Sequence, residues 1–219
     1  MAMQYFSKNH NVDSGTSSIY RKVSRTIRKA IGIYPDHMEM ILQANIYSKL
    51  GMFREAVRVY REAICINPEN AETYFNLGNA YYGMGMFRES ITAYRQAVGK
   101  RSRYLAAIYK LGNVYGKLGM FEEAIDATKR AISIKPNFTS AHKNLGAYYW
   151  KSAMYKEAIE SLGQVLKIEP EDAETRYSLA CYYLETQERD SAFMEYKILK
   201  DHSPEFAVRL ARYFKESPG

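Results

Sequence analysis

The sequence is short of the residues from which disulfides, metal sites and catalytic centres are built. Its 219 residues include two cysteines and four histidines. Cys65 and Cys181 lie far apart in the chain, which predicts reduced thiols in a cytoplasmic protein rather than a disulfide framework. The histidines are scattered, without an HExxH motif or a paired Cys-x-x-Cys, so we expect no metal site.

Long apolar runs and a phosphate loop are missing as well. No stretch of about 18 apolar residues is present, so no membrane span is expected. Residues 1–18 lack the apolar core of a secretory signal. Gly78 and Gly83 have the spacing of a phosphate loop, but Met84 stands where such a loop needs lysine. We therefore expect no cofactor, no catalytic residue and no enzymatic activity.

Positive charge is concentrated near the N-terminus. The chain carries a net charge of +7, and residues 1–36 contribute +4 of it, with six basic side chains against two acidic ones. Because the rest of the chain is nearly balanced, its surface is not suited throughout to nucleic acid. We expect no nucleic-acid partner.

What the sequence does contain is an internal repeat. It reads GMFREA at 51–56, GMFRES at 85–90, GMFEEA at 119–124 and AMYKEA at 153–158, so each copy begins 34 residues after the last. Self-similarity at a fixed period of this size is typical of stacked repeat architectures.

Each copy is predicted to form two helices. Between 71 and 104, apolar and small side chains recur at helical spacing from Tyr74 to Tyr81 and again from Phe87 to Ala97. Glycines break the first helix, and in neighbouring copies a proline stops the second. Two columns across the copies hold only small residues: Ala44, Gly78, Gly112, Gly146 and Ala180, and Ala56, Ser90, Ala124, Ala158 and Ala192. Small side chains let helices approach closely, and one pair cannot bury its apolar face alone, so the pairs are expected to stack.

The period, these columns and the terminal NP, KP or EP resemble the tetratricopeptide repeat family over residues 37–206. The resemblance implies an all-α, right-handed α-solenoid of stacked antiparallel helix pairs with a capping helix at each end. Five units are expected, at 37–70, 71–104, 105–138, 139–172 and 173–206. Gln43, Ser102 and Arg189 depart from the family pattern, and two of them lie in the first and last units.

The two ends are expected to differ from the repeats. Residues 1–18 are predicted to be a disordered tail. A closing helix is expected over 204–216, and the C-terminal cap is assigned to 207–219. Residues 19–36 form a basic amphipathic segment, a degenerate repeat. Its apolar face holds Ile19, Tyr20, Val23, Ile27 and Ile31, and its basic face holds Arg21, Arg25, Arg28 and Lys29. Three roles stay open: the segment caps the stack, lies on an anionic membrane surface, or docks in the groove of another copy and builds a homo-oligomer.

The resemblance also implies a concave groove lined by the first helix of each unit. Its candidate residues are Ile41, Asn45, Lys49, Phe75, Asn79, Tyr82, Tyr109, Asn113, Lys117, Lys143, Trp150, Lys151 and Tyr177. The asparagine amides suit an extended peptide backbone and are not expected to support the core. The rings offer apolar pockets, and the lysines favour acidic ligands. The alternative is that asparagine simply tolerates a polar helix face.

We therefore expect a scaffold that binds proteins or peptides with acidic or aromatic segments. Within the family, the layout is similar to magnetosome-associated scaffolds. That likeness implies self-assembly through the N-terminal helix and an organelle coat attached to the membrane indirectly, through membrane proteins. The expected location is the cytoplasm, peripheral to an organelle or the inner membrane. The alternatives are an assembly factor for a secretion or pilus system and the partner-binding subunit of a separate enzyme.

Overall fold

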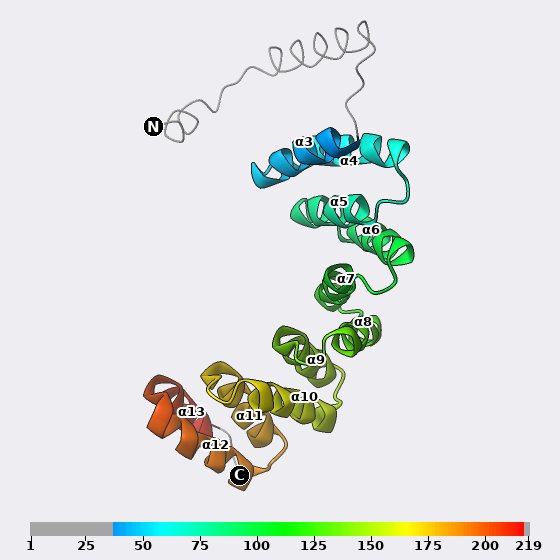
Figure 1. Cartoon of the computed structure of the whole chain (residues 1–219). Helices are drawn as coiled ribbons and strands as arrows, with labels where there is room; N and C mark the ends of the chain where they lie inside the picture. The colour runs from blue at the N-terminus through cyan, green and yellow to red at the C-terminus, as the bar shows by residue number, and fades with distance from the viewer. Residues whose placement is uncertain (1–36, 217–219) are drawn as a thin grey trace, which may run out of the picture.

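The computed structural model describes residues 37–216, which form eleven α-helices joined by short turns and no strand (Figure 1). The helices are α3 (His37–Lys49), α4 (Phe53–Ile66), α5 (Ala71–Gly83), α6 (Phe87–Lys100), α7 (Leu105–Lys117), α8 (Phe121–Ile134), α9 (Thr139–Lys151), α10 (Tyr155–Ile168), α11 (Ala173–Glu185), α12 (Arg189–His202) and α13 (Pro204–Glu216). Consecutive helices pack in antiparallel pairs, and the pairs stack into a crescent. This arrangement confirms the predicted α-solenoid.

A glycine in the left-handed conformation ends the first helix of the first three units. Gly51, Gly85 and Gly119 have φ of 74°, 73° and 74°. At the first of these turns the N–H of Gly51 donates to the carbonyl of Ser48, and that of Met52 to the carbonyl of Tyr47. These two hydrogen bonds close the helix end, and the chain reverses its direction within about three residues.

The same turn is built without glycine in the last two units. Ala153 and Gln187 occupy it with φ of 58° and 63°. We expect Ala153→Gly and Gln187→Gly each to stabilise the fold by roughly 0.5–1 kcal/mol. Relief of left-handed strain, about 1–2 kcal/mol, is partly offset by the greater freedom of glycine in the unfolded chain. Thermal unfolding followed by circular dichroism measures the change. Gly119→Ala is the matched control and should destabilise, since an added Cβ there meets no atom within 4 Å and only the strain remains. Equal melting temperatures for all variants would contradict this account.

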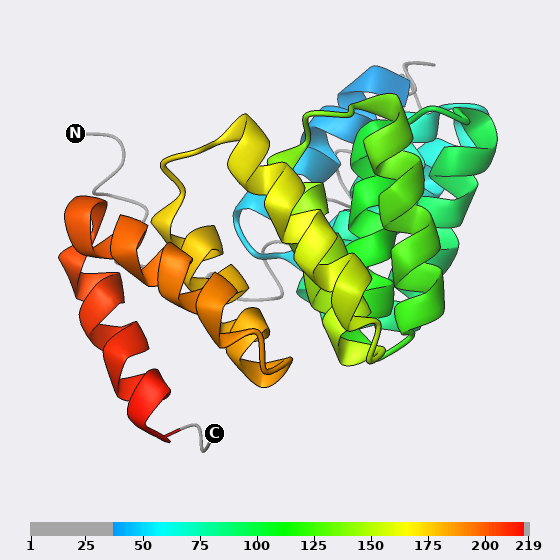
Figure 2. The ribbon, with the colours of Figure 1, turned by 90° about the horizontal axis from the view of Figure 1, so that it is seen from below.

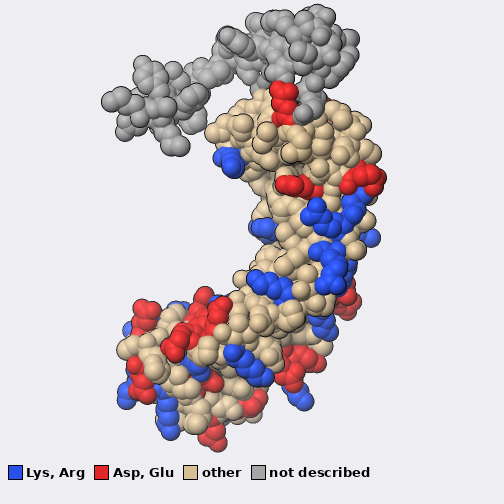
Figure 3. Space-filling model, in the orientation of Figure 1, with Lys and Arg blue, Asp and Glu red and all other residues tan. Residues whose placement is uncertain are grey.

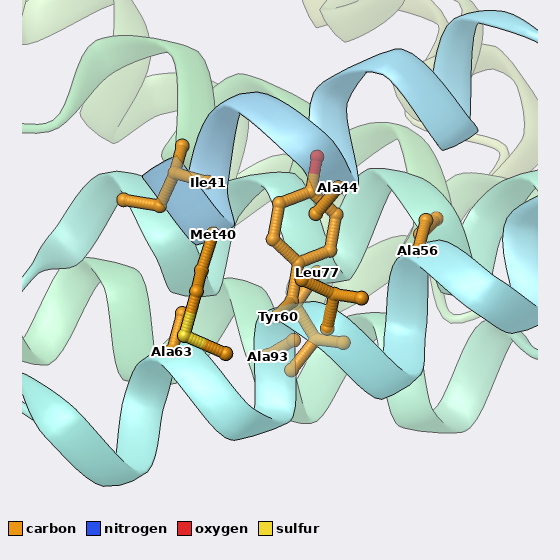
Figure 4. Close-up of a cluster of buried hydrophobic side chains, with 10 residues drawn as sticks. Met40, Ile41, Ala44, Ala56, Tyr60, Ala63, Leu77 and Ala93 are labelled. Carbon is orange, nitrogen blue, oxygen red and sulfur yellow. The ribbon is translucent and has the colours of Figure 1, made fainter. Parts of the chain in front are cut away.

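The core follows the predicted columns of small residues. The second-helix column from Ala56 to Ala192 is fully buried in every unit. In the first cluster, shown in Figure 4, the ring of Tyr60 from α4 rises past Ala44 of α3, with Ala56, Ala63 and Leu77 around it. Small side chains at these points let two helices approach while a ring from the partner fills the space beside them. The sequence-based packing scheme is confirmed here.

The closing helix expected over 204–216 is confirmed as α13. It begins at Pro204, three residues before the cap assigned to 207–219, because proline is well suited to the first turn of a helix, where its missing N–H has no partner to lose. Ala207 and Leu210 are buried against α11 and α12 at the end of the stack (Figure 2). The N-terminal segment at 19–36 and the tail before it lie outside the described residues. Within residues 37–216 no helix is long and apolar enough to cross a membrane.

Candidate functional site

The first helices line the hollow of the crescent. In Figure 1, α5 and α7 lie on its concave side and α6 and α8 on its outer side. The residues expected in a groove lie on the first helices. Some of them contact a neighbouring unit, and the others are accessible on the surface of the hollow.

One predicted groove column joins neighbouring units. Phe75 and Tyr104 have ring centroids 5.2 Å apart, and those of Tyr109 and Phe138 are 4.7 Å apart. The next two pairs are an ion pair between Lys143 and Asp172 at 2.6 Å and a ring contact between Tyr177 and Phe206 at 5.8 Å. In each pair the second residue lies 29 positions further on and is the last residue of the same unit, at the start of the helix that follows. These side chains therefore couple the units as well as bordering the hollow.

The Lys143–Asp172 pair predicts a pH-dependent contribution to stability. Burial would raise the pKa of Asp172, but hydrogen bonds from Lys143 and Thr175 lower it below its ordinary value. The hydrogen bond to Asp172 raises the pKa of Lys143. The carboxylate's contribution is thus present above about pH 4 and lost as pH falls through the depressed pKa. The ammonium's contribution is lost only as pH rises past about 10.4.

Asp172→Asn tests this ion pair without removing the helix cap, because Asn70 caps α5 in the same way, accepting from the N–H of Thr73. At neutral pH we expect a loss of about 0.2–1 kcal/mol, typical of a partly exposed pair. In urea titrations the loss should shrink as pH falls below about 4. Glu171→Gln, which removes an exposed neighbouring carboxylate, is the control. A difference that does not vary between pH 3 and pH 7 would argue against the ion pair.

The asparagine column takes part in the fold, contrary to expectation. Tyr60 donates its hydroxyl to Oδ1 of Asn45 at 2.5 Å, and Tyr94 donates to Oδ1 of Asn79 at 2.7 Å. Oδ1 of Asn113 accepts from Nδ2 of Asn144 at 2.7 Å. The expectation that these amides do not support the core is therefore wrong for their carbonyl oxygens. Nδ2 of Asn79 has no partner within residues 37–216 and remains a donor for a ligand.

Ile41 is a second correction. Its side chain is only 5% exposed and packs in the first core cluster, beside Met40 and Ala44. Ile41 therefore contributes to the core and offers almost no surface to a ligand.

The accessible part of the hollow combines rings with lysines. Tyr82 is 37% exposed, and Nζ of Lys117 lies 5.3 Å from its ring centroid and 4.9 Å from that of Phe87. Lys49 and Lys151 are also exposed. Trp150 stacks on Tyr182 with ring centroids 3.8 Å apart and 10° between the planes. Figure 3 shows isolated blue lysine or arginine atoms along the hollow edge and mixed charges at the C-terminal end.

Two tyrosines of this surface were missed in the sequence. Tyr148 from α9 lies against Gly116 of α7, where an added Cβ would meet its ring, and Tyr182 forms the stack on Trp150. Burial raises the pKa of Tyr148 to about 12. The sequence did contain a signal for Tyr148. Gly116 stands in a column that otherwise holds Ser48, Tyr82, Trp150 and a leucine, so it leaves a space that a ring from the next unit fills.

Two side chains of types that can take part in catalysis, His142 and Cys181, lie in structural surroundings. Nε2 of His142 lies 2.8 Å from the carbonyl oxygen of Pro136. Burial raises the pKa of the Cys181 thiol, which disfavours the reactive thiolate. Among residues 37–216, no cluster of three or more histidine, cysteine or acidic side chains is placed to hold a metal ion.

Solved structures with this fold include proteins of similar length. The structure of YrrB, described as a TPR protein with an unusual peptide-binding site, is 24% identical with a TM-score of 0.71, covering 84% of this chain and 96% of that one. A crystal structure of MamA is 24% identical with a TM-score of 0.68, covering 79% and 96%. MamA from Desulfovibrio magneticus RS-1 is 17% identical with a TM-score of 0.70, covering 77% and 95%. These likenesses establish the fold.

Curated protein sequences give no match. Family models of the tetratricopeptide repeat match residues 71–101, 106–138 and 140–172, and a TPR repeat model matches 44–85. Together they span most of the stacked helix pairs, in register with the period read from the sequence. The chain therefore belongs to the tetratricopeptide repeat family.

Proposed function

We propose that this protein–protein interaction scaffold captures extended peptide segments in its hollow, with a preference for acidic segments that carry an aromatic residue. The observation that carries the proposal is the cationic and aromatic surface in the middle of the crescent. There Lys117 lies over Tyr82 and Phe87, and Lys151 is exposed at the end of the helix that carries Trp150. The peptide site named for YrrB supports the same use of this fold.

Each component contributes a different interaction. Lys117 and Lys151 attract carboxylates, and an apolar or aromatic side chain of the ligand can pack beside Tyr82. Nδ2 of Asn79 can donate to a peptide carbonyl whatever the ligand sequence. Because Oδ1 of Asn79 already accepts from Tyr94, the amide contacts the peptide backbone through its Nδ2 donor.

A peptide titration tests the proposal. Two short fluorescein-labelled peptides share one tryptophan and differ only in carrying aspartate and glutamate or the matching amides. We expect the acidic peptide to bind about tenfold more tightly, a difference of about 1.4 kcal/mol, and to lose this advantage at high salt. Lys117→Gln with Lys151→Gln should abolish the preference. Arg130→Gln with Lys167→Gln removes the same charge from exposed positions on α8 and α10 and should leave the preference intact. Equal binding of both peptides, or equal loss in both double variants, would refute the site.

Three more specific predictions stay open: self-assembly, a magnetosome-type coat and indirect membrane association. They depend on residues 19–34, which lie outside the described part of the chain. Light scattering of the intact protein and of residues 37–219, each at about tens of micromolar, tests self-assembly directly. The secretion or pilus assembly factor and the subunit of a separate enzyme remain the alternative settings for the same groove.

A further inference from the structure

The face of α3 at the N-terminal end of the stack is apolar, and none of residues 37–216 covers it. Met38, Leu42, Ile46 and Leu50 are 58%, 59%, 58% and 68% exposed. They follow each other at intervals of four residues, so they form one stripe along the helix, called here the α3 stripe. Four large apolar side chains in one row form a contiguous apolar patch, unlike the single exposed apolar residues that are normal on a protein surface.

In the later units the middle of the same face packs on the unit before it, whereas the position of Met38 is exposed in each of them. Ala80 and Val114, which correspond to Ile46, are fully buried. Tyr148 and Tyr182, at the same position, pack on Gly116 and Trp150 of the preceding first helix. At the position of Leu42, Asn76 and Asn144 donate hydrogen bonds to Asn45 and Asn113. The middle of the α3 stripe therefore faces the place of a preceding unit, where a terminal repeat is expected to be polar.

We propose that residues 19–34 of the same chain cover the α3 stripe, packing on it as the second helix of one unit packs on the first helix of the next. The chain supplies this segment immediately before α3. Pro35 stands two residues ahead of His37, much as Pro68 stands three residues ahead of Ala71. Helix α4 ends two residues before Pro68 and packs on α5 across that short link.

The composition of the segment fits this position. Ile19, Val23, Ile27 and Ile31 recur at intervals of four, matching the spacing of the α3 stripe. Packed there, the segment buries its apolar face on another apolar face and leaves its basic face in water. In a neighbour's hollow the same basic face would meet Lys117 and Lys151, which carry charge of the same sign. Charge therefore favours the α3 stripe over the groove.

Limited trypsin digestion of the full chain tests the proposal. The segment contains five cleavage sites, at Arg21, Lys22, Arg25, Arg28 and Lys29, and Lys8 in the preceding tail provides an internal reference. We expect cleavage in the segment to be on the order of tenfold or more slower than at Lys8, because packing limits access to the open state. Leu42→Gln with Ile46→Gln should raise the segment's cleavage rate to that of Lys8. Arg61→Gln, at an exposed position on α4 rather than on the stripe, should not.

A second variant separates packing from damage to α3. Ile27→Gln with Ile31→Gln should expose the segment equally while circular dichroism stays unchanged, whereas Arg25→Gln with Lys29→Gln leaves three of the five sites and should keep their protection. Protection that is independent of protein concentration, in samples that light scattering shows to be monomeric, supports packing within one chain. Protection that grows with concentration would assign the segment to a second copy and overturn the proposal. So would protection that appears only with phosphatidylserine vesicles, or wild-type cleavage as fast as at Lys8.

Discussion

Replacing Gly78 by alanine should lower the free energy of unfolding by about 2 kcal/mol, the middle of the range for overpacking a close-packed interior. A Cβ at this position would lie 2.6 Å from two ring carbons of Tyr94, nearer than carbon atoms approach without displacement. The Tyr94 ring is fully buried, so it cannot swing into solvent. Moving it would also disturb its hydrogen bond to Asn79. The new methyl group therefore forces α5 and α6 apart.

Gly163→Ala is the matched control. Gly163 lies inside α10, and a Cβ added there meets no atom within 4 Å. Alanine should stabilise this helix by up to about 1 kcal/mol through helix propensity alone. Opposite signs for the two substitutions, measured by urea unfolding, would confirm that close packing rather than conformation fixes glycine at 78. Hydrogen exchange should place the damage of Gly78→Ala in α5, α6 and their neighbours, since a solenoid couples nearest units. A Gly78→Ala protein as stable as the wild type would show that Tyr94 can move at little cost.

The fold could be predicted because the sequence repeats its own packing rules. Five copies of each column, read together, distinguish a residue that must be small from one that happens to be small. The left-handed turn is less visible in the last two units, because Ala153 and Gln187 adopt it without glycine. There the two flanking helices impose the turn on residues that do not favour it.

The candidate site was harder to predict, because a side chain on the concave face can meet either a ligand or the next unit. Lys143 has the appearance of a groove cation until Asp172 is considered 29 residues later. The ring pairs beginning at Phe75 and Tyr109 have the same spacing, so the signal lay between columns rather than within one. Asn79 likewise appears free until the hydroxyl of Tyr94 is placed beside it. Neither contact follows from the helical pattern of a single unit.

Asn79→Ala should destabilise the protein by about 1–3 kcal/mol, because it leaves the hydroxyl of a buried tyrosine without its acceptor. Tyr94→Phe removes the donor instead and should cost only about 0.5–1.5 kcal/mol. The double variant lacks both groups, so its loss should fall below the sum of the single losses by about 1 kcal/mol. Urea unfolding of the four proteins measures this coupling. Additive losses would show that the 2.7 Å contact does not stabilise the fold.

Alkaline unfolding tests the burial of the Tyr94 hydroxyl. Burial raises the pKa of Tyr94 from 10.0 to about 12. The folded chain therefore keeps this phenol protonated where the unfolded chain ionises. The stability that follows is complete below pH 10 and is lost as pH rises towards 12. Because the phenylalanine variant has no such group, the cost of Tyr94→Phe should shrink across this interval, while that of Gly78→Ala should not vary in step with it. A cost of Tyr94→Phe that stays constant from pH 8 to pH 11 would mean that the hydroxyl titrates alike in both states, and that burial does not raise its pKa.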